Sequence, residues 1–174
     1  MKLGGLGLIV LLLFSCTQSQ QNQVQKDSYF KVKEYFEKEV NRLNKRKPRV
    51  DKTVSINGAK EQRQLQIADF KNEFNTFISS DINKASWNGA FQIKKAKDVT
   101  IYTTADEKIP VKRLEIRYQH NKVKSISILL LTTNILYHSS DTLTYFPDSL
   151  YEIKKTQKIK LLNEKKYAVI GRFR

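Results

Sequence analysis

The stretch VKRLEIRYQHNKVKSISILLL, residues 111–131, carries the pattern that decides the fold. In its first half apolar and charged side chains alternate, so that Leu114, Ile116 and Tyr118 share one face of an extended chain. The polar tetrapeptide QHNK follows, and a second run rich in β-branched and apolar residues extends from Val123 to Leu131. This arrangement predicts two antiparallel strands joined by a short connection.

Two features of this hairpin leave its surface open to more than one interpretation. Arg113, Glu115 and Arg117 point away from the apolar face, where they form either a charged recognition ladder or an ordinary solvent face. The segment 128–131 is apolar at every position, so both of its faces are expected to be covered. The cover is either a second layer, a partner or an apolar ligand, or the segment is the central strand of a closed or strongly curved sheet.

The same period of two continues on both sides of the hairpin, from Trp87 onward. Further strands are predicted at residues 91–93, 99–101, 135–138, 142–146, 151–154, 158–162 and 167–173. The connections between them are mostly two to six residues long and carry no helical pattern. Parallel strands need long crossovers, so we expect antiparallel neighbours.

The N-terminal part of the chain shows helical periodicity instead. Apolar residues recur at steps of three and four from Tyr29 to Leu43, which predicts an amphipathic helix that ends before Pro48. Asp27 or Ser28 is a suitable cap for the start of this helix.

A second helix is expected from near Glu61 to Ser79, after a short alternating segment that ends in the Asn57–Gly58 turn signal. One face of this helix carries large apolar side chains at 3-4-3 spacing, namely Ile67, Phe70, Phe74 and Phe77. We interpret this stripe as part of the core, packed on the sheet, rather than as a ligand-binding surface.

The resulting fold class is α+β, with two N-terminal helices followed by a meandering antiparallel β-sheet. A curved sheet, as in cystatin-like, nuclear-transport-factor-like or lipoprotein-carrier-like folds, suits the same order of elements.

The first sixteen residues have the pattern of an export signal. Lys2 precedes an apolar and glycine run of twelve residues, too short to span a bilayer and typical of a signal peptide. The run ends in Leu13-Phe14-Ser15-Cys16, which resembles the lipobox of bacterial lipoproteins and holds the only cysteine. This resemblance implies lipid transfer to the Cys16 thiol, cleavage before Cys16 and acylation, including palmitate, of the new N-terminus. The alternative is an ordinary signal peptide with a chance cysteine.

These features divide the chain into three parts. Residues 1–15 are the expected signal peptide, residues 16–26 are the lipidated cysteine and a Gln-rich tether, and residues 27–174 are a single α+β domain. Neither an Asp nor an acidic cluster follows Cys16. By resemblance to known lipoproteins, this implies a lipid-anchored protein of the outer membrane that faces the periplasm.

Several segments of the mature chain also carry a resemblance. They are Val54–Gly58, Phe77, Asp81–Lys84 ahead of Trp87, and Pro110–Ile116. Together they resemble an uncharacterised family of Bacteroidota lipoproteins over most of the mature chain. The resemblance implies kinship and compartment, and it carries no activity.

The charge of the chain points to an anionic partner. The formal net charge is +15 at pH 7. An exported lipoprotein rarely meets nucleic acid, so anionic lipid headgroups, lipopolysaccharide phosphates or an acidic protein fit better. The alternative is a solvated, lysine-rich surface. The densest run of cations consists of Lys45, Arg46, Lys47 and Arg49. It is either an anionic-surface contact or a favourable end for the helix dipole.

The sequence contains few groups that support catalysis. The two histidines, His120 and His138, have no partner at metal-ligand spacing, and no nucleophile elbow or phosphate loop occurs. Asp69 and Glu73 lie one turn apart on the expected second helix, where acids are usually solvated. We therefore expect no enzymatic activity, no cofactor and no metal.

The expected function is a non-enzymatic binding or structural module in an envelope protein assembly. The membrane holds the chain through its lipid, and a protein of the envelope is the expected partner. The alternative is a carrier or sensor of an apolar or amphiphilic ligand in a curved-sheet cavity. The sequence leaves the oligomeric state open.

Overall fold

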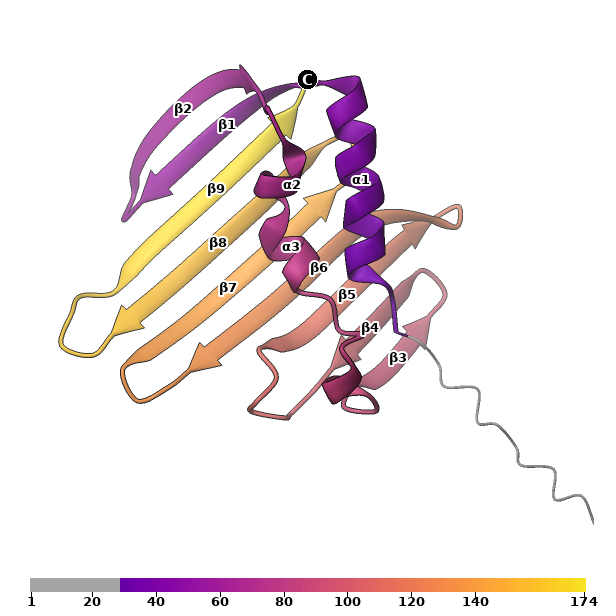
Figure 1. Ribbon diagram of the computed structural model, residues 1–174, viewed down its shortest axis with the longest axis vertical. Coiled ribbons are helices and arrows are strands. Elements are labelled where there is room, and N and C mark those ends of the chain that lie inside the picture. The colour runs from indigo at the N-terminus through magenta and orange to yellow at the C-terminus, as the bar shows by residue number, and fades with distance from the viewer. Residues whose placement is uncertain (1–28) are drawn as a thin grey trace, which may run out of the picture.

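The computed structural model describes residues 29–174, which form a nine-stranded antiparallel sheet with short helices over one face (Figure 1). The helical elements are α1 Val32–Arg46, α2 Phe70–Glu73, α3 Asn75–Ser79 and the 3-10 turn Ala85–Trp87. The strands are β1 Arg49–Ile56, β2 Ala59–Gln66, β3 Gln92–Ala96, β4 Val99–Thr103, β5 Val111–Gln119, β6 Lys122–Thr133, β7 Tyr137–Phe146, β8 Leu150–Ile159 and β9 Lys165–Phe173. The predicted α+β class and the antiparallel sheet are confirmed.

The strand order across the sheet is β2-β1-β9-β8-β7-β6-β5-β4-β3. From β3 to β9 each strand lies beside its predecessor, as expected for a meander with short connections. The exception is β1, which lies beside β9 although the two are far apart in the sequence. Nothing in the local pattern of either strand indicates this pairing.

The first helix forms as its periodicity predicts. In α1 the side chains of Val32, Phe36, Val40 and Leu43 are buried. The helix ends at Lys47, which has the left-handed φ of 49° and donates its backbone N–H to the carbonyl of Leu43 over 2.8 Å. The suggested caps, residues 27 and 28, lie outside the described residues.

The predicted helix from Glu61 to Ser79 is wrong in its first part. Residues 59–66 are β2, paired with β1 from Arg49↔Gln66 to Ile56↔Ala59. Asn57 and Gly58 both have positive φ, which matches the tight hairpin turn whose twist suits antiparallel strands. The five consecutive polar or charged residues from Lys60 to Gln64 offer a helix no apolar face, so the hairpin prevails.

The remaining part of that segment does form helices, α2 and α3, and the predicted core stripe is largely confirmed. Phe70, Phe74 and Phe77 are fully buried, whereas Ile67 is half-buried. The hairpin β1–β2 therefore separates α1 from α2 and α3, which corrects the prediction that two helices precede the whole sheet.

Two pairs of predicted strands are each one continuous strand. The predicted segments 135–138 and 142–146 both fall in β7, which begins at Tyr137, and the segments 151–154 and 158–162 both fall in β8, which ends at Ile159. Polar runs interrupt the apolar alternation in both, but the ladder continues through them with pairs such as Asp141↔Lys155. Residues 135–136 and 160–162 are in turns and not in strands.

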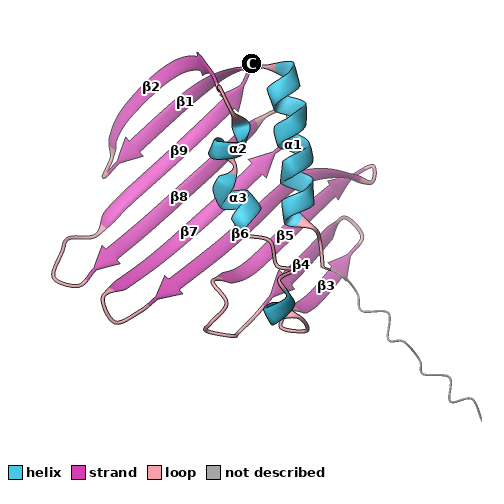
Figure 2. Ribbon diagram, in the orientation of Figure 1, coloured by secondary structure: helices cyan, strands magenta, loops and turns pink. Residues whose placement is uncertain are grey.

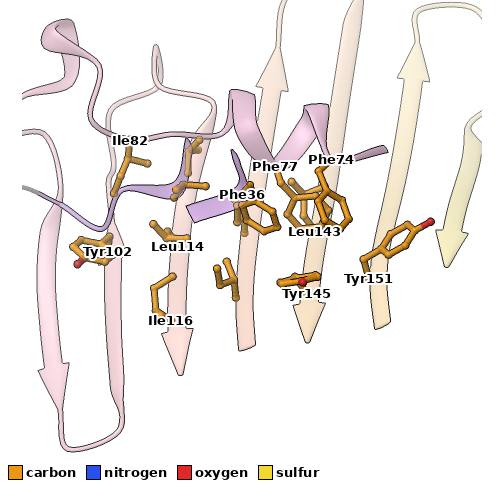
Figure 3. Packing of buried hydrophobic residues seen from close by; sticks show 14 of the residues in the cluster. Phe36, Phe74, Phe77, Ile82, Tyr102, Leu114, Ile116, Leu143, Tyr145 and Tyr151 are labelled. Carbon is orange, nitrogen blue, oxygen red and sulfur yellow. The ribbon is translucent and has the colours of Figure 1, made fainter. Parts of the chain in front are cut away.

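The core fills the space between the helices and the sheet, and the helices all lie over the same face (Figure 2). Aromatic rings are prominent in it. Phe36 of α1, Phe74 between α2 and α3, and Tyr145 and Tyr151 of the sheet make edge-to-face contacts (Figure 3). Phe77 of α3 makes edge-to-face contacts with Phe74 and Tyr145. Among the described residues, the members of this cluster extend from Tyr29 to Phe173, so the core draws on the helices and on most of the strands.

Gly171 is required by the tightest contact in this core. It pairs with Tyr151 between β8 and β9, and the tyrosine ring lies directly over it. A Cβ at residue 171 would meet ring carbons of Tyr151 at 2.2 Å and the hydroxyl oxygen at 2.4 Å. Only glycine lets this ring lie flat on its partner strand.

The Gly171→Ala variant is expected to lose about 1–3 kcal/mol of unfolding free energy, because the added methyl forces the Tyr151 ring off its position. Urea denaturation measures this loss. In a Tyr151→Ala background the same substitution should cost almost nothing, since the obstructing ring is gone. An equal cost in both backgrounds would show that the clash is not the cause.

Candidate functional site

The end of α1 is held to the turn between β7 and β8 by charged groups. Arg42 Nη1 lies 2.7 Å from Asp148 Oδ1, and Arg46 also contacts this carboxylate. The hydrogen bond from Arg42 holds the pKa of Asp148 below its ordinary value. Cations in the last turn also suit the negative end of the helix dipole.

A second contact joins the same turn of helix to the middle of the sheet. Arg42 binds Glu39 through two nitrogens, at 3.0 Å and 2.7 Å. The hydroxyl of buried Tyr145 donates to the same Glu39 carboxylate. Burial, followed by the charge of Glu39, raises the pKa of Tyr145, so this hydroxyl stays protonated and acts as a donor.

The neighbouring end of the sheet carries a further ion pair. Asp51 of β1 accepts a hydrogen bond from Gln64 over 3.1 Å and contacts the guanidinium of Arg174. This guanidinium lowers the pKa of Asp51. The backbone N–H of Arg174 donates to the carbonyl of Arg49 over 3.0 Å, which brings the end of β9 beside the start of β1.

We use the term basic corner for the place where α1 ends, β1 begins and β9 ends. Its cations are Lys45, Arg46, Lys47, Arg49, Arg172 and Arg174. Four of them were predicted from the sequence as an anionic-surface contact, and the structure brings those four together at one end of the fold. Arg46 is partly neutralised by Asp148.

The other three predicted residues are free to act on a partner. Lys45, Lys47 and Arg49 are exposed, and none of them forms an ion pair within residues 29–174. Lys47 is placed by the left-handed turn that ends α1, and buried Pro48 fixes the chain immediately after it. The turn at Lys47 and the buried Pro48 thus fix the backbone that carries these three unpaired cations.

Sequence reasoning missed Arg172 and Arg174. Both belong to this site because β9 pairs with β1, with Asp51 opposite Arg172 and Val50 opposite Phe173. More than a hundred residues separate the two strands, and each arginine alone looks like a solvated end of a strand. Only a correct prediction of the β1–β9 pairing would have found them.

The basic corner borders a shallow hollow of about 380 Å³. Its lining comprises Asp51, Asp148, Ser149, Leu150, Arg172, Phe173 and Arg174. Guanidinium groups bind carboxylates and phosphates through two parallel hydrogen bonds. The arrangement can therefore hold an anionic group, with the acids of the hollow limiting where that group binds.

The two acids that the sequence placed on one helix are used in folding contacts. Asp69 caps α2 by accepting from the backbone N–H of Lys71 over 2.8 Å. Glu73 accepts from the hydroxyl of Tyr151 over 2.7 Å and pairs with Lys52 at 2.8 Å. The two carboxylates therefore bind different elements and do not face a common site.

The histidines lie at separate places in the sheet. His120 has a left-handed φ of 50° in the β5–β6 turn, and His138 Nδ1 lies 2.8 Å from the hydroxyl of Thr133. Among residues 29–174 no three His, Cys, Asp or Glu side chains form a group that could hold a metal ion.

The face of the sheet opposite the helices carries the charged ladder of β5. Glu115 lies between Arg113 at 2.5 Å and Arg117 at 2.6 Å, so this ladder is largely neutralised by its own members. The arginines lower the pKa of Glu115, Arg113 having the largest effect. Beside it, Leu129 and Leu131 are half-buried although no described helix covers this face.

The predicted signal peptide, Cys16 and the tether lie outside the described residues. In the part of the chain that the structure describes, no helix has the length and apolar character needed to cross a membrane. No family model, curated protein or solved structure matches this chain.

The Asp148→Asn variant tests the contact that holds α1 at the basic corner. The lowered pKa of Asp148 means that its stabilising effect is present above its unfolded pKa, about 4, and is lost as the pH falls through the folded value. We expect the variant to be less stable than wild type by up to about 1 kcal/mol at neutral pH. At about pH 2 the two proteins should be equally stable.

Urea denaturation at several pH values measures this difference. Glu107→Gln is the matched control, because Glu107 is exposed and forms no ion pair among residues 29–174. A deficit in Asp148→Asn that does not change with pH would contradict the assignment.

Proposed function

We propose that this chain is a lipid-anchored, non-enzymatic binding module of the bacterial envelope that recognises an acidic surface of a partner protein through the basic corner. The observation that carries the proposal is the set of exposed, unpaired cations Lys45, Lys47 and Arg49, held beside Arg172. Fixed cations of one sign guide an anionic partner to the site and determine its orientation.

The position of the basic corner favours a protein partner over the anchoring membrane. The described chain begins at Tyr29, near the start of α1, and the corner lies at the other end of this helix (Figure 1). Fifteen residues of helix span about 22 Å. A tether attached near Tyr29 would join the domain at the end of α1 that is far from the corner, which leaves the corner accessible to a partner.

The anchor itself rests on the sequence of residues 1–16. The lipobox-like Leu13-Phe14-Ser15-Cys16 supports acylation of Cys16 in the outer membrane, with the protein facing the periplasm. Several acyl chains together give stable attachment, since each buried CH₂ contributes about 0.8 kcal/mol.

The anchor is tested by the Cys16→Ser variant, grown with an alkynyl palmitate analogue. We expect wild type to incorporate the label and the variant to incorporate none, because the thiol that accepts the lipid is absent. Ser15→Ala is the matched control, since it keeps a small residue before the cysteine and should be labelled like wild type. Label in Cys16→Ser would place the acyl chain elsewhere.

A binding function agrees better with the described residues than catalysis or ligand transport. Asp69 and Glu73, the two acids considered for catalysis, are engaged in capping α2 and in binding Tyr151. The space between helices and sheet is packed with aromatic rings, and the ring of Tyr151 lies on Gly171. These rings occupy the space between helices and sheet that a carrier would use for its ligand.

Charge reversal of the basic corner tests the recognition proposal. We compare wild type with Lys45→Glu/Lys47→Glu/Arg49→Glu after chemical cross-linking in the producing cells and quantitative mass spectrometry of the captured proteins. Proteins bound through the corner should be recovered at least about tenfold less from the triple variant, since several attractive contacts become repulsive.

The control variant is Lys94→Glu/Lys97→Glu/Lys122→Glu, which changes the net charge equally with exposed lysines of other strands and turns. It should recover the same proteins as wild type. Equal recovery from all three chains would overturn the proposed role of the corner. Circular dichroism confirms that each variant keeps its fold.

A further inference from the structure

Two hairpin tips lie side by side at one end of the sheet. They are the β6–β7 turn, residues 134–136, and the β8–β9 turn, residues 160–164. Tyr137 and Ile159 are paired across β7 and β8, and the backbone N–H of Lys160 donates to the carbonyl of Leu136 over 2.8 Å. The two tips therefore form one connected surface, which we call the hairpin end.

The hairpin end exposes large apolar side chains. Leu161 is 96% exposed and Ile135 is 89% exposed, followed by Leu136 at 63% and Leu162 at 54%. These are the four most exposed large apolar residues of the described chain, and Ile159 at 36% adjoins them. Such a concentration of exposed apolar side chains marks an interaction site more often than chance.

Leu161 is unusual in its backbone as well as in its exposure. Its φ of 67° lies in the left-handed region, where glycine or asparagine is the usual residue. Leucine at this position gains neither a favoured backbone nor burial within the chain. An exposed leucine with a positive φ departs from the usual backbone preference and from the usual burial of apolar side chains. An interaction with another molecule explains this departure.

Several backbone amides of the two tips are already paired. The N–H of Leu136 donates to the side chain of Asn134 over 3.0 Å, and the N–H of Asn134 donates to the carbonyl of Tyr137 over 2.8 Å. The N–H of Leu162 donates to the carbonyl of Ile159 over 3.0 Å. The tips can thus enter an apolar medium without exposing these amides to it unpaired.

Lysines surround the apolar side chains. Lys158, Lys160 and Lys165 are exposed, and none of them forms an ion pair within residues 29–174. Lys166 lies 3.5 Å from Glu164, which is the acid of the β8–β9 turn. The hairpin end therefore combines an apolar tip with a positive rim.

We infer that the hairpin end inserts into the headgroup region of a bilayer that contains anionic phospholipids. The apolar tips reach the boundary of the acyl chains, and the rim lysines bind lipid phosphates. The positive rim favours a membrane by charge complementarity. Size favours it too, because four apolar side chains on two turns, with Ile159 beside them, are far fewer than the about 20–30 residues per side of a stable protein interface.

The direction of the hairpin end agrees with this partner. In Figure 1 the two tips lie at the lower left, whereas the end of α1 lies at the top. A membrane below the molecule would therefore contact the tips while the basic corner faces away from it. The inference concerns residues other than those of the proposed function, and it holds whether or not Cys16 is acylated.

The test is cosedimentation of the expected mature chain, residues 16–174 with Cys16→Ser so that no acyl chain contributes, with lipid vesicles. Vesicles of phosphatidylcholine with an equal part of phosphatidylglycerol are compared with vesicles of phosphatidylcholine alone. Wild type should bind the anionic vesicles, and Ile135→Ser/Leu161→Asn/Leu162→Ser should bind them at least about tenfold more weakly, since the apolar contacts are lost. Asparagine suits the left-handed backbone at residue 161, so this variant keeps the turn.

The matched control is Val54→Ser/Ile56→Ser/Phe146→Ser, which removes three other exposed apolar side chains without changing the net charge. It should bind like wild type. Lys158→Gln/Lys160→Gln/Lys165→Gln should reduce binding to the level seen on phosphatidylcholine alone, whereas Lys94→Gln/Lys97→Gln/Lys122→Gln should keep the preference for anionic vesicles.

Three results would overturn the inference. Wild type could fail to bind anionic vesicles, or the tip variant could bind them as well as wild type, which would leave only the overall positive charge as the cause. Sedimentation velocity could instead show that wild type is a dimer and the tip variant a monomer, in which case the hairpin end joins two copies of the chain.

Discussion

The pairing of β1 with β9 is the constraint on which the rest of the structure depends. Seven residue pairs, from Val50↔Phe173 to Ile56↔Tyr167, join strands at opposite ends of the chain. This ladder attaches the β1–β2 hairpin to the meander and makes all nine strands one sheet. Contacts of such long sequence separation require most of the chain to be ordered before they form, so they carry a high entropic cost.

The helices are attached to this sheet by rings and by half-buried carboxylates. Phe36, Phe74 and Phe77 pack against Tyr145, and Phe74 also packs against Tyr151. The two tyrosine hydroxyls then donate to Glu39 of α1 and Glu73 of α2.

An unpaired hydroxyl or carboxylate at this depth would be costly, so each bond selects one position of its helix along the sheet. Arg42 and Lys52 complete the pairing of the two carboxylates. The polar bonds in this core therefore specify how the helices lie, while the rings provide the burial.

These constraints place two different surfaces at opposite ends of the molecule. The basic corner combines the end of α1 with the meeting point of β1 and β9, and its cations are largely uncompensated. The hairpin end combines exposed leucine and isoleucine side chains with lysines. An acidic protein and an anionic bilayer are the partners that we propose for them, and both surfaces could be occupied at once because they do not overlap.

Local periodicity was enough for much of the fold. The stripe of α1, the alternation of β5 and the short connections of the meander are all visible within a few residues, because each reports which side of one element is buried. The same argument failed at residues 61–66, where a polar run gave no apolar stripe and the Asn57–Gly58 turn decided the outcome. Local periodicity also predicted β7 and β8 as two strands each, because polar runs interrupt the alternation although the hydrogen-bonded ladder continues through them.

Sequence alone determined four cations of the basic corner and, through Lys45 to Arg49, their place at the end of a helix. Tertiary structure decided the rest. Arg172 and Arg174 reach the corner only because β9 and β1, which are distant in the chain, become neighbours. Leu136 meets Lys160 because the register of β7 on β8 brings the two hairpin tips together. Side-chain period encodes which face of an element is buried, but the identity of its neighbour depends on free energies summed over the whole sheet, and no single segment contains that information.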